Sequence, residues 1–361
     1  MRRAWHNVVA FWRKYEHHLG VGAMVVGFTF DIILAKRPDS LVDNVLLLAY
    51  LFAAGCLIIV LNLREMRYNK GAEPLVLLLI LQFCFGGLAS NLLVLYGHSG
   101  TLVGSALFLG MLVALVIGNE FLRTRYVRLR FNVGVYYFLL LTYVLIAAPT
   151  FIFHGVSTLV FVGSGFLSLA VFAVFAAALW AAVLRGAERR GARDITIIVA
   201  TTFALFNGLY FLDVIPPVPL SLKSIGVYHS VLHQSQGGYI ALFEAAPWWE
   251  LWRDTSGTFT IAGENTAFCF SSVFAPADLS TTIYHRWEKY DESSGQWVTQ
   301  SRISYAINGG LSEGYHGYTI KSVSPGQWRC DVETSSGALI GRVGFSVVKS
   351  PSPPALSQSV L

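Results

Sequence analysis

The charged residues best placed for chemistry lie close together near the start of the chain. They are one arginine and three aspartates: Asp31, Arg37, Asp39 and Asp43. Asp31 lies in an apolar run, where a carboxylate is costly unless it is paired or has a function. Two interpretations therefore stay open. Either Arg37 folds back over Asp31 as a structural ion pair, or the cluster handles a proton, an ion or a substrate.

The histidines do not form a recognisable metal motif. His229 and His233 have the i, i+4 spacing that can bind a metal on a helix, but no glutamate stands where a metallohydrolase needs one. The sequence also has no Gly-rich phosphate loop, nucleophile elbow, paired-carboxylate motif or Cys-x-x-Cys. We therefore expect no metal, no cofactor and no catalytic residue, which favours a protein that is not an enzyme.

Aromatic residues indicate a candidate surface for binding. Residues 247–252 contain three tryptophans, which cannot all face a small core. Two interpretations stay open: the run rests on the outer leaflet of a membrane, or it contacts a glycan or a partner protein. The candidate residues for such an interfacial or ligand surface are Trp248, Trp249, Trp252, His285, Tyr315 and His316.

The four cysteines divide into two pairs. Cys56 and Cys84 lie in apolar runs and are typical small packing residues. Cys269 and Cys330 lie in the polar half with Trp287 between them, an order found in immunoglobulin domains. A disulfide between them is possible, but the phenylalanines on either side of Cys269 compete for the inward face. The sequence leaves this bridge open.

The composition indicates what holds these residues in place. Of 361 residues, 54% are hydrophobic and only 13% are charged, about half the charged fraction of soluble proteins. Long apolar runs fill residues 1–214, whereas the remainder is polar and rich in Gly and Trp. The net charge of +5 comes from basic clusters between the apolar runs, so it is no sign of nucleic-acid binding.

Seven apolar segments are long enough to cross a bilayer as helices, which takes about 20 residues. They are residues 19–35, 44–63, 75–95, 101–121, 133–153, 156–184 and 195–214. Lys and Arg collect in cytoplasmic loops. The N-terminal segment and alternate loops hold fifteen of them, against two in the other short loops. This predicts a cytoplasmic N-terminus and a C-terminal region outside.

The chain is therefore expected to have five parts. Residues 1–18 form a cytoplasmic amphipathic segment or a helical extension of the first span, and residues 19–214 form a seven-helix membrane bundle. Prolines from Pro216 onward end the last helix. A linker (215–238), an all-β immunoglobulin-like sandwich (239–349) and a disordered Pro/Ser-rich tail (350–361) follow.

The clearest predicted strand covers residues 328–333. Its residues alternate, so Trp328, Cys330 and Val332 face one way and the charged residues between them face the other.

Several short motifs are distinctive. They include Pro216-Pro217-Val218-Pro219-Leu220, Val273-Phe274-Ala275-Pro276, His285-Arg286-Trp287, Gly314-Tyr315-His316-Gly317-Tyr318, Gly326-Gln327-Trp328-Arg329 and Gly341-Arg342-Val343-Gly344-Phe345, with Gly27-Phe28-Thr29-Phe30-Asp31 in the apolar half. With these motifs the chain resembles bacterial multi-pass membrane proteins that end in domain of unknown function 2914. The resemblance covers nearly the whole chain but implies no activity. Where this family commonly has basic residues, the chain has Leu311 and His316, which argues against an anion-binding loop there.

We expect an integral inner-membrane protein that displays a periplasmic β-sandwich. The sandwich would bind an envelope glycan, a lipid headgroup, or a periplasmic or membrane protein, and nucleic acid is excluded. The alternative is a transporter, a flippase or an enzyme acting on a lipid-linked substrate at the outer leaflet. It would use the cluster Asp31, Arg37, Asp39 and Asp43, with Asp213 at the outer end of the last span.

Overall fold

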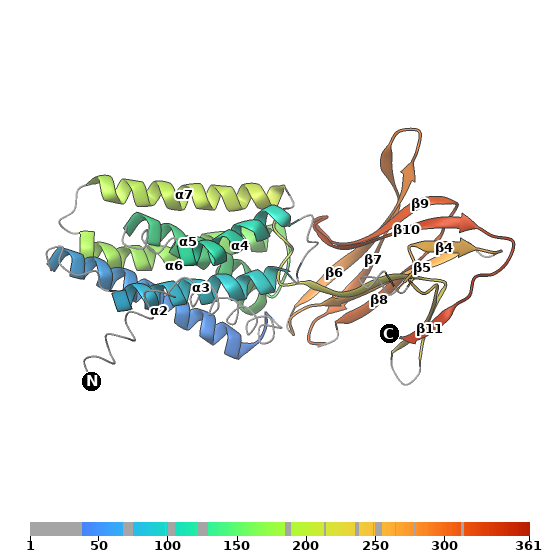
Figure 1. Cartoon of the computed structure of the whole chain (residues 1–361), viewed down its shortest axis with the longest axis horizontal. Coiled ribbons are helices and arrows are strands. Elements are labelled where there is room, and N and C mark those ends of the chain that lie inside the picture. Colours follow the sequence, from blue (N-terminus) through green and yellow to red (C-terminus); the bar gives the residue numbers. More distant parts are fainter. Residues whose placement is uncertain are drawn as a thin grey trace, which may run out of the picture. The chain divides into compact units, whose positions relative to one another are not determined.

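The chain divides into two compact units, one built from helices and the other from strands (Figure 1). The computed structural model describes residues 38–67, 75–97, 99, 105–121, 129–184, 189–212, 214–234, 238–247, 249, 255–263, 265–277, 279–311 and 314–361. The predicted amphipathic segment (1–18) and the first predicted span (19–35) lie outside these residues.

The described part of the helical unit contains six α-helices. They are α2 (Leu41–Arg67), α3 (Leu75–Gly97), α4 (Ala106–Phe121), α5 (Leu129–Ala148), α6 (Thr158–Leu179) and α7 (Arg189–Phe211). Short π-helical turns, Pro149–Phe153 and Trp180–Leu184, follow α5 and α6. Five of the described helices are long and apolar enough to cross a membrane, and the apolar part of α4, Ala106–Gly118, is shorter.

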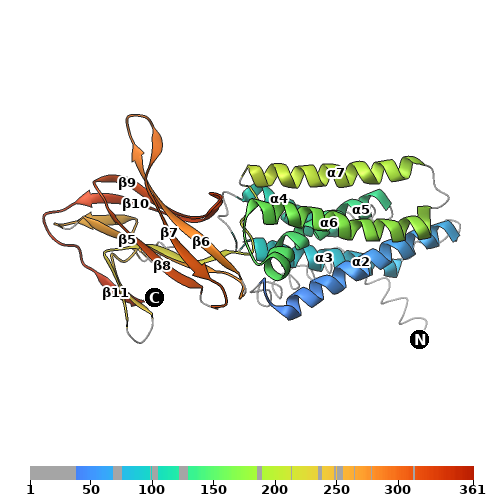
Figure 2. The same ribbon diagram turned by 180° about the vertical axis from the view of Figure 1, so that it is seen from behind.

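Helix α5 forms the centre of the helical unit. It packs against α2, α3 and α7 (Figures 1 and 2), and most of its side chains are buried. Two buried tyrosines bond within this unit: the Tyr96 hydroxyl donates to the Thr142 carbonyl at 3.0 Å, and the Tyr143 hydroxyl donates to Asn44 at 3.2 Å. Such bonds remove the cost of polar groups in apolar surroundings.

The β unit contains eleven strands in its described residues. They are β1 (Ser221–Tyr228), β2 (Ser230–His233), β3 (Tyr239–Phe243), β4 (Thr258–Ile261), β5 (Thr266–Phe274), β6 (Ser280–Asp291), β7 (Gln296–Asn308), β8 (Tyr315–Ser322), β9 (Gly326–Thr334), β10 (Leu339–Lys349) and β11 (Ser357–Val360). The sheets have the orders β1-β5-β8, β4-β10-β9-β6-β7 and β11-β3-β2. All pairs are antiparallel except β4 with β10.

The core of the β unit lies between the β1-β5-β8 sheet and the five-stranded sheet. Its apolar clusters draw residues from both, including Val227 and Cys269 from the first and Trp287 and Phe345 from the second. Inward-facing Trp328, Cys330 and Val332 also belong to these clusters, which confirms the alternation predicted for residues 328–333.

Two predicted boundaries are wrong. The expected linker (215–238) contains β1 and β2, and β1 pairs with β5 along its whole length. The tail (350–361), expected to be disordered, contains β11, which pairs with β3. Strand β11 is mostly exposed and joins its neighbour through backbone hydrogen bonds, a feature that polar composition does not reveal.

Candidate functional site

Only part of the predicted acidic cluster lies within the described residues. Asp31, Arg37 and Asp213 lie outside them. Asp39 and Asp43 stand at the start of α2, where the Asp43 backbone N–H donates to Ser40 Oγ at 3.4 Å. An acidic side chain in the first turn of a helix is stabilised by the helix dipole. Ser40 therefore caps α2, and Asp43 is explained as an acidic residue in the first turn of the helix. The role of Asp31 stays a prediction.

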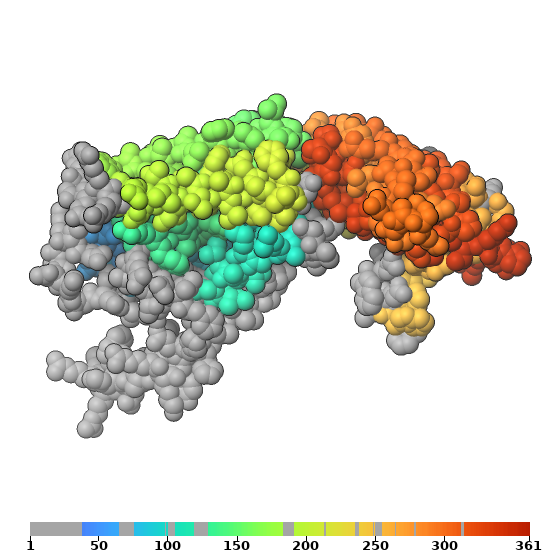
Figure 3. All heavy atoms as spheres, turned by 90° about the horizontal axis from the view of Figure 1, so that it is seen from above, coloured from blue at the N-terminus to red at the C-terminus, as the bar shows by residue number. Residues whose placement is uncertain are grey.

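The helical unit has an apolar groove of about 500 Å³ between α6 and α7. In Figure 3 the yellow-green surface of α7 lies beside the greener surface of α6. Leu169, Phe172 and Phe203 are among the lining residues, and the Thr196 hydroxyl donates to the Ala192 carbonyl of its own helix. The described lining of the groove is therefore mainly apolar.

The predicted aromatic surface is divided by the structure. Trp248 and Trp252 lie outside the described residues, and Trp249 is 60% exposed. Neighbours on a strand point to opposite faces, so Tyr315 packs against the core while His316 contacts the aromatic rings of Phe270 and Tyr239. The described candidates Tyr315 and His316 therefore lie on opposite faces of β8.

His285 is not on a surface, which corrects its assignment as a surface residue. It lies on β6 with 0% exposure, between Ser271 on β5 and Thr319 on β8. Its Nε2 lies 2.8 Å from Ser271 Oγ and its Nδ1 lies 3.0 Å from Thr319 Oγ1. Burial lowers the pKa of His285 to about 3, so the ring is neutral at ordinary pH.

The hydrogen bonds around His285 form a closed polar network inside the core. Tyr305 Oη lies 2.6 Å from Ser271 Oγ, and Trp287 Nε1 donates to Thr319 Oγ1 at 3.0 Å. Gly317 makes room for this arrangement, because any side chain there would run into the Tyr305 ring. Since its polar groups bond to each other, the network is explained by packing and not by ligand binding.

Cys269 and Cys330 form a disulfide in the structure, with their Cα atoms 6.6 Å apart. It joins β5 to β9 and therefore links the two sheets of the core. The competition with neighbouring phenylalanines is resolved because both faces of β5 are covered: Cys269 faces the core, and Phe270 packs against β2 and β3.

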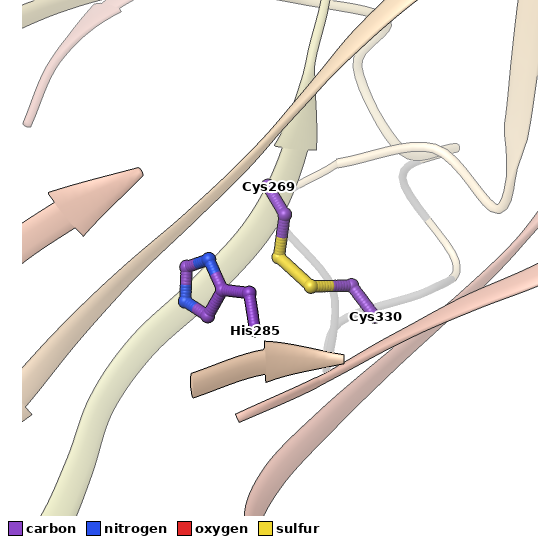
Figure 4. A group of neighbouring side chains, drawn as sticks. All are labelled: Cys269, His285 and Cys330. Carbon is purple, nitrogen blue, oxygen red and sulfur yellow. A yellow bond between two sulfur atoms is a disulfide. The ribbon is translucent and has the colours of Figure 1, made fainter. Parts of the chain in front are cut away.

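The disulfide also decides how a nearby group of metal-ligating residues is interpreted. Cys269, His285 and Cys330 have side-chain ligand atoms within 4.8 Å of one another (Figure 4). A cysteine binds metal as a thiolate, and neither Cys269 nor Cys330 can be a thiolate while they are joined in a disulfide. In the described structure this group is therefore a cross-linked core.

Seven charged residues cover the other face of the five-stranded sheet. They are Arg286, Glu288, Arg302, Arg329, Asp331, Glu333 and Arg342, and we call them the charged face. The strand register aligns Arg342 on β10, Asp331 on β9, Arg286 on β6 and Arg302 on β7 in a single row across the sheet. Arg329 stands opposite Glu288 in the next row.

Each carboxylate of the charged face is held by arginine. Arg342 bonds Asp331 through two nitrogens, Nε and Nη2, both at 2.6 Å, and Arg286 Nη2 reaches the same carboxylate at 3.1 Å. Glu333 accepts from Arg302 Nε at 2.5 Å. The pair of Arg342 and Asp331, joined by two parallel bonds, is the stronger form of charge-assisted hydrogen bond.

Glu288 completes the set of held carboxylates. It accepts from Arg329 Nε at 2.5 Å. The Arg329 guanidinium also stacks on the Trp297 ring at 4.4 Å, and the Arg302 guanidinium stacks on the Tyr284 ring at 3.9 Å.

The carboxylates are buried and the guanidinium groups are partly exposed. The side chains of Asp331, Glu333 and Glu288 are 0%, 2% and 6% exposed, whereas those of the four arginines are 17–39% exposed. The arginines therefore lie over the acids, and solvent meets a layer of guanidinium groups.

The carboxylates raise the pKa of the two arginines that share Asp331. The hydrogen bonds that Arg342 donates to Asp331 raise the pKa of Arg342. Burial lowers the pKa of Arg286, but its hydrogen bond to Asp331 and the charges of Glu333 and Glu288 outweigh burial, so its pKa is raised as well. Both groups are fixed as cations.

The comparison with known families points to the same part of the β unit. Residues 280–347 match a family whose description is "Protein of unknown function (DUF2914)". This confirms the resemblance for those residues, which run from β6 into β10. The DUF2914 segment contains all seven residues of the charged face. No curated protein matches the chain.

The charged face was only partly visible in the sequence. The alternation of residues 328–333 placed three charged side chains on one face of a strand. It could not show that β6, β7 and β10 add arginines to the same rows, because that depends on strand pairing. Arg302 and Arg342, each between inward-facing residues, were the available signal.

Proposed function

We propose that this is an integral membrane protein that holds its β unit outside the cytoplasm, where the unit binds an envelope component or a partner protein. Five described helices suit a membrane span, and the excess of Lys and Arg in alternate loops favours a periplasmic β unit and an inner-membrane location. The β unit carries partly exposed charged side chains on its charged face.

The observation that carries this proposal is the buried disulfide between β5 and β9. Disulfides persist in oxidising compartments and are rare in the cytosol. Cys269 and Cys330 are both 0% exposed and link the two sheets of the core. Trp287 lies in the same cluster, which supports an immunoglobulin-like sandwich as the finer fold assignment.

The burial of the described polar residues in the core of the β unit favours a binding role over catalysis. Ser271 and His285 are the pair most similar to a nucleophile and its base, yet both are fully buried. The charged face has no such pair and instead presents partly exposed guanidinium groups. The rival function, transport or catalysis through Asp31, Arg37, Asp39 and Asp43, has no further support from the described residues.

The experiment is to trap the thiol state of the chain in living cells. Cells expressing the full chain with Cys56→Ala and Cys84→Ala are quenched in acid, and free thiols are alkylated with a mass tag before and after reduction. We expect Cys269 and Cys330 to accept the tag only after reduction. A pair that is alkylated without reduction would contradict an exported β unit.

A further inference from the structure

We propose that the charged face binds phosphate groups, with the guanidinium groups of Arg342, Arg286 and Arg329 as the donors. The ligand would be a phosphate-bearing lipid headgroup or a soluble phosphate polymer, which share this chemistry. The inference rests on the proposed function in one respect, since it names the ligand class for the binding role of the β unit.

The charged face carries more positive charge than its own carboxylates need. Its four arginines face three acids, and the row of Arg342, Asp331, Arg286 and Arg302 has three cations to one anion. Arg286 and Arg302 are direct cross-strand neighbours, and like charges in that relation destabilise a sheet. Glu333 lies near both but carries one charge, so an anion bound from solvent would complete the neutralisation.

The arginines also keep hydrogen-bond donors that the acids do not use. Arg342 bonds Asp331 through Nε and Nη2, and Arg329 bonds Glu288 through Nε. Among the described residues, Arg342 Nη1 and both terminal nitrogens of Arg329 make no hydrogen bond. The same holds for Arg286 Nη1. These four nitrogens are terminal NH2 groups on three arginines whose side chains are partly exposed to solvent.

This arrangement fits phosphate better than carboxylate. A planar carboxylate is matched by the paired nitrogens of one guanidinium, and the acids of the sheet already occupy that arrangement on Arg342. Phosphate is tetrahedral and accepts hydrogen bonds from several directions. Neighbouring strands lie about 4.8 Å apart, so donors from β6, β9 and β10 can converge on one such group.

The guanidinium groups are held in place before any ligand binds. Arg329 is fixed between Glu288 and the Trp297 ring, and Arg342 is fixed by two bonds to Asp331. A side chain that is already ordered loses little entropy on binding, and this favours affinity. Because these arginines lie in a sheet and not in a loop, the inference is independent of Leu311 and His316.

The test is a titration of the full chain in nanodiscs of zwitterionic lipid with inorganic tripolyphosphate, followed by calorimetry. We expect binding that weakens as salt is raised and that is at least tenfold weaker in Arg342→Gln. The matched control is Lys349→Gln, which removes the same charge from an exposed position of β10. Its affinity should change less than twofold.

Two further variants keep the test decisive if Arg342→Gln unfolds the β unit. Arg342→Lys keeps the charge beside Asp331 but loses the second terminal nitrogen, and Arg329→Gln leaves Asp331 untouched. Each should weaken tripolyphosphate binding at least threefold, measured at a temperature where the variant's melting curve shows the β unit still folded. The proposal is overturned if tripolyphosphate does not bind, if citrate binds equally well, or if Lys349→Gln weakens binding as much as Arg342→Gln.

A second arm separates the two sources of phosphate. Nanodiscs carrying the chain are mixed with vesicles of phosphatidylcholine containing phosphatidic acid, and the vesicles are floated on a gradient. Recovery with the vesicles, lost in Arg342→Gln, supports a lipid headgroup; tripolyphosphate binding without recovery supports a soluble polymer. The two proposals can fail separately, because thiol trapping reports on compartment and these titrations report on ligand.

Discussion

At the residue scale, His285 makes the core of the β unit sensitive to acid. Its folded pKa is about 3, against 6.5 for an unperturbed histidine, because burial disfavours the charged ring. Between these values the unfolded chain binds a proton that the folded chain excludes. Stability from the neutral ring is therefore full above pH 6.5 and is lost as pH falls toward 3.

We predict that the variant His285→Gln has a flatter dependence of stability on pH. Between pH 6.5 and 4.5 the parent should lose about 2–3 kcal/mol of unfolding free energy through this one group. Calorimetry of the full chain in detergent measures the difference. The control His233→Gln alters an exposed histidine and should keep the parent's slope. An unchanged slope in His285→Gln would mean that the buried ring does not titrate as described.

The disulfide gives a second residue-scale prediction. Replacing both Cys269 and Cys330 with Ala removes a bridge between residues 61 positions apart, which we expect to cost roughly 4 kcal/mol by loop-closure entropy. Chemical denaturation under oxidising conditions measures this. Changing Cys56 and Cys84 to Ala is the matched control, because both are free cysteines. If reduction left the parent's midpoint unchanged, the bridge would not stabilise the fold.

The environment of a single residue can be predicted from the sequence when it depends on one strand alone, and not when it depends on contacts with other strands. The inward direction of Trp328 and Cys330 follows from alternation along one strand, so it was predictable. The burial of His285 depends on Ser271 and Thr319, which come from two other strands and supply its hydrogen bonds. A buried polar residue needs hydrogen-bond partners, and the sequence of its own strand does not reveal partners that come from other strands.

At the element scale, the rows of the charged face hold β6, β7, β9 and β10 in register. Asp331 is the centre of this arrangement, since it is fully buried between Arg286 and Arg342. Removing one partner of a buried pair leaves an uncompensated charge, which is more costly than the pair's own net contribution.

We predict that Asp331→Asn lowers the unfolding free energy by about 3 kcal/mol or more. Adding Arg342→Gln to Asp331→Asn should recover part of this loss, because one stranded cation is gone. Urea denaturation of all three variants completes the double-mutant cycle. Glu292→Gln, at the exposed β6–β7 turn, is the control for loss of one negative charge and should be nearly neutral. Strictly additive effects would refute the pairing.

The elements themselves were predictable where side chains carry the signal. The six described helices lie close to the bounds predicted from the apolar runs. The main differences are that α4 begins at Ala106 instead of residue 101, and α7 begins at Arg189 instead of residue 195. Strands β1 and β11 were missed for a physical reason. Strand β1 alternates poorly, and β11 is polar and exposed, so both are identified by backbone pairing with β5 and β3.

At the scale of the whole molecule, the change from helix to strand lies where the prolines place it. Helix α7 ends at Phe211, and β1 begins at Ser221 after Pro216, Pro217 and Pro219. Proline cannot continue a helix, so this boundary is readable from sequence. The division of the chain into a helical unit and a β unit follows from it.

The central claim is that the β unit stands outside the cytoplasm, and cysteine labelling in intact cells tests it most directly. In a chain with Cys56→Ala and Cys84→Ala, Ser293→Cys is placed at the exposed β6–β7 turn, and Arg125→Cys is placed in a predicted cytoplasmic loop. A membrane-impermeant maleimide should label Ser293→Cys in intact cells and Arg125→Cys only after the membrane is opened. The reverse pattern, with Arg125→Cys labelled and Ser293→Cys protected, would contradict the account.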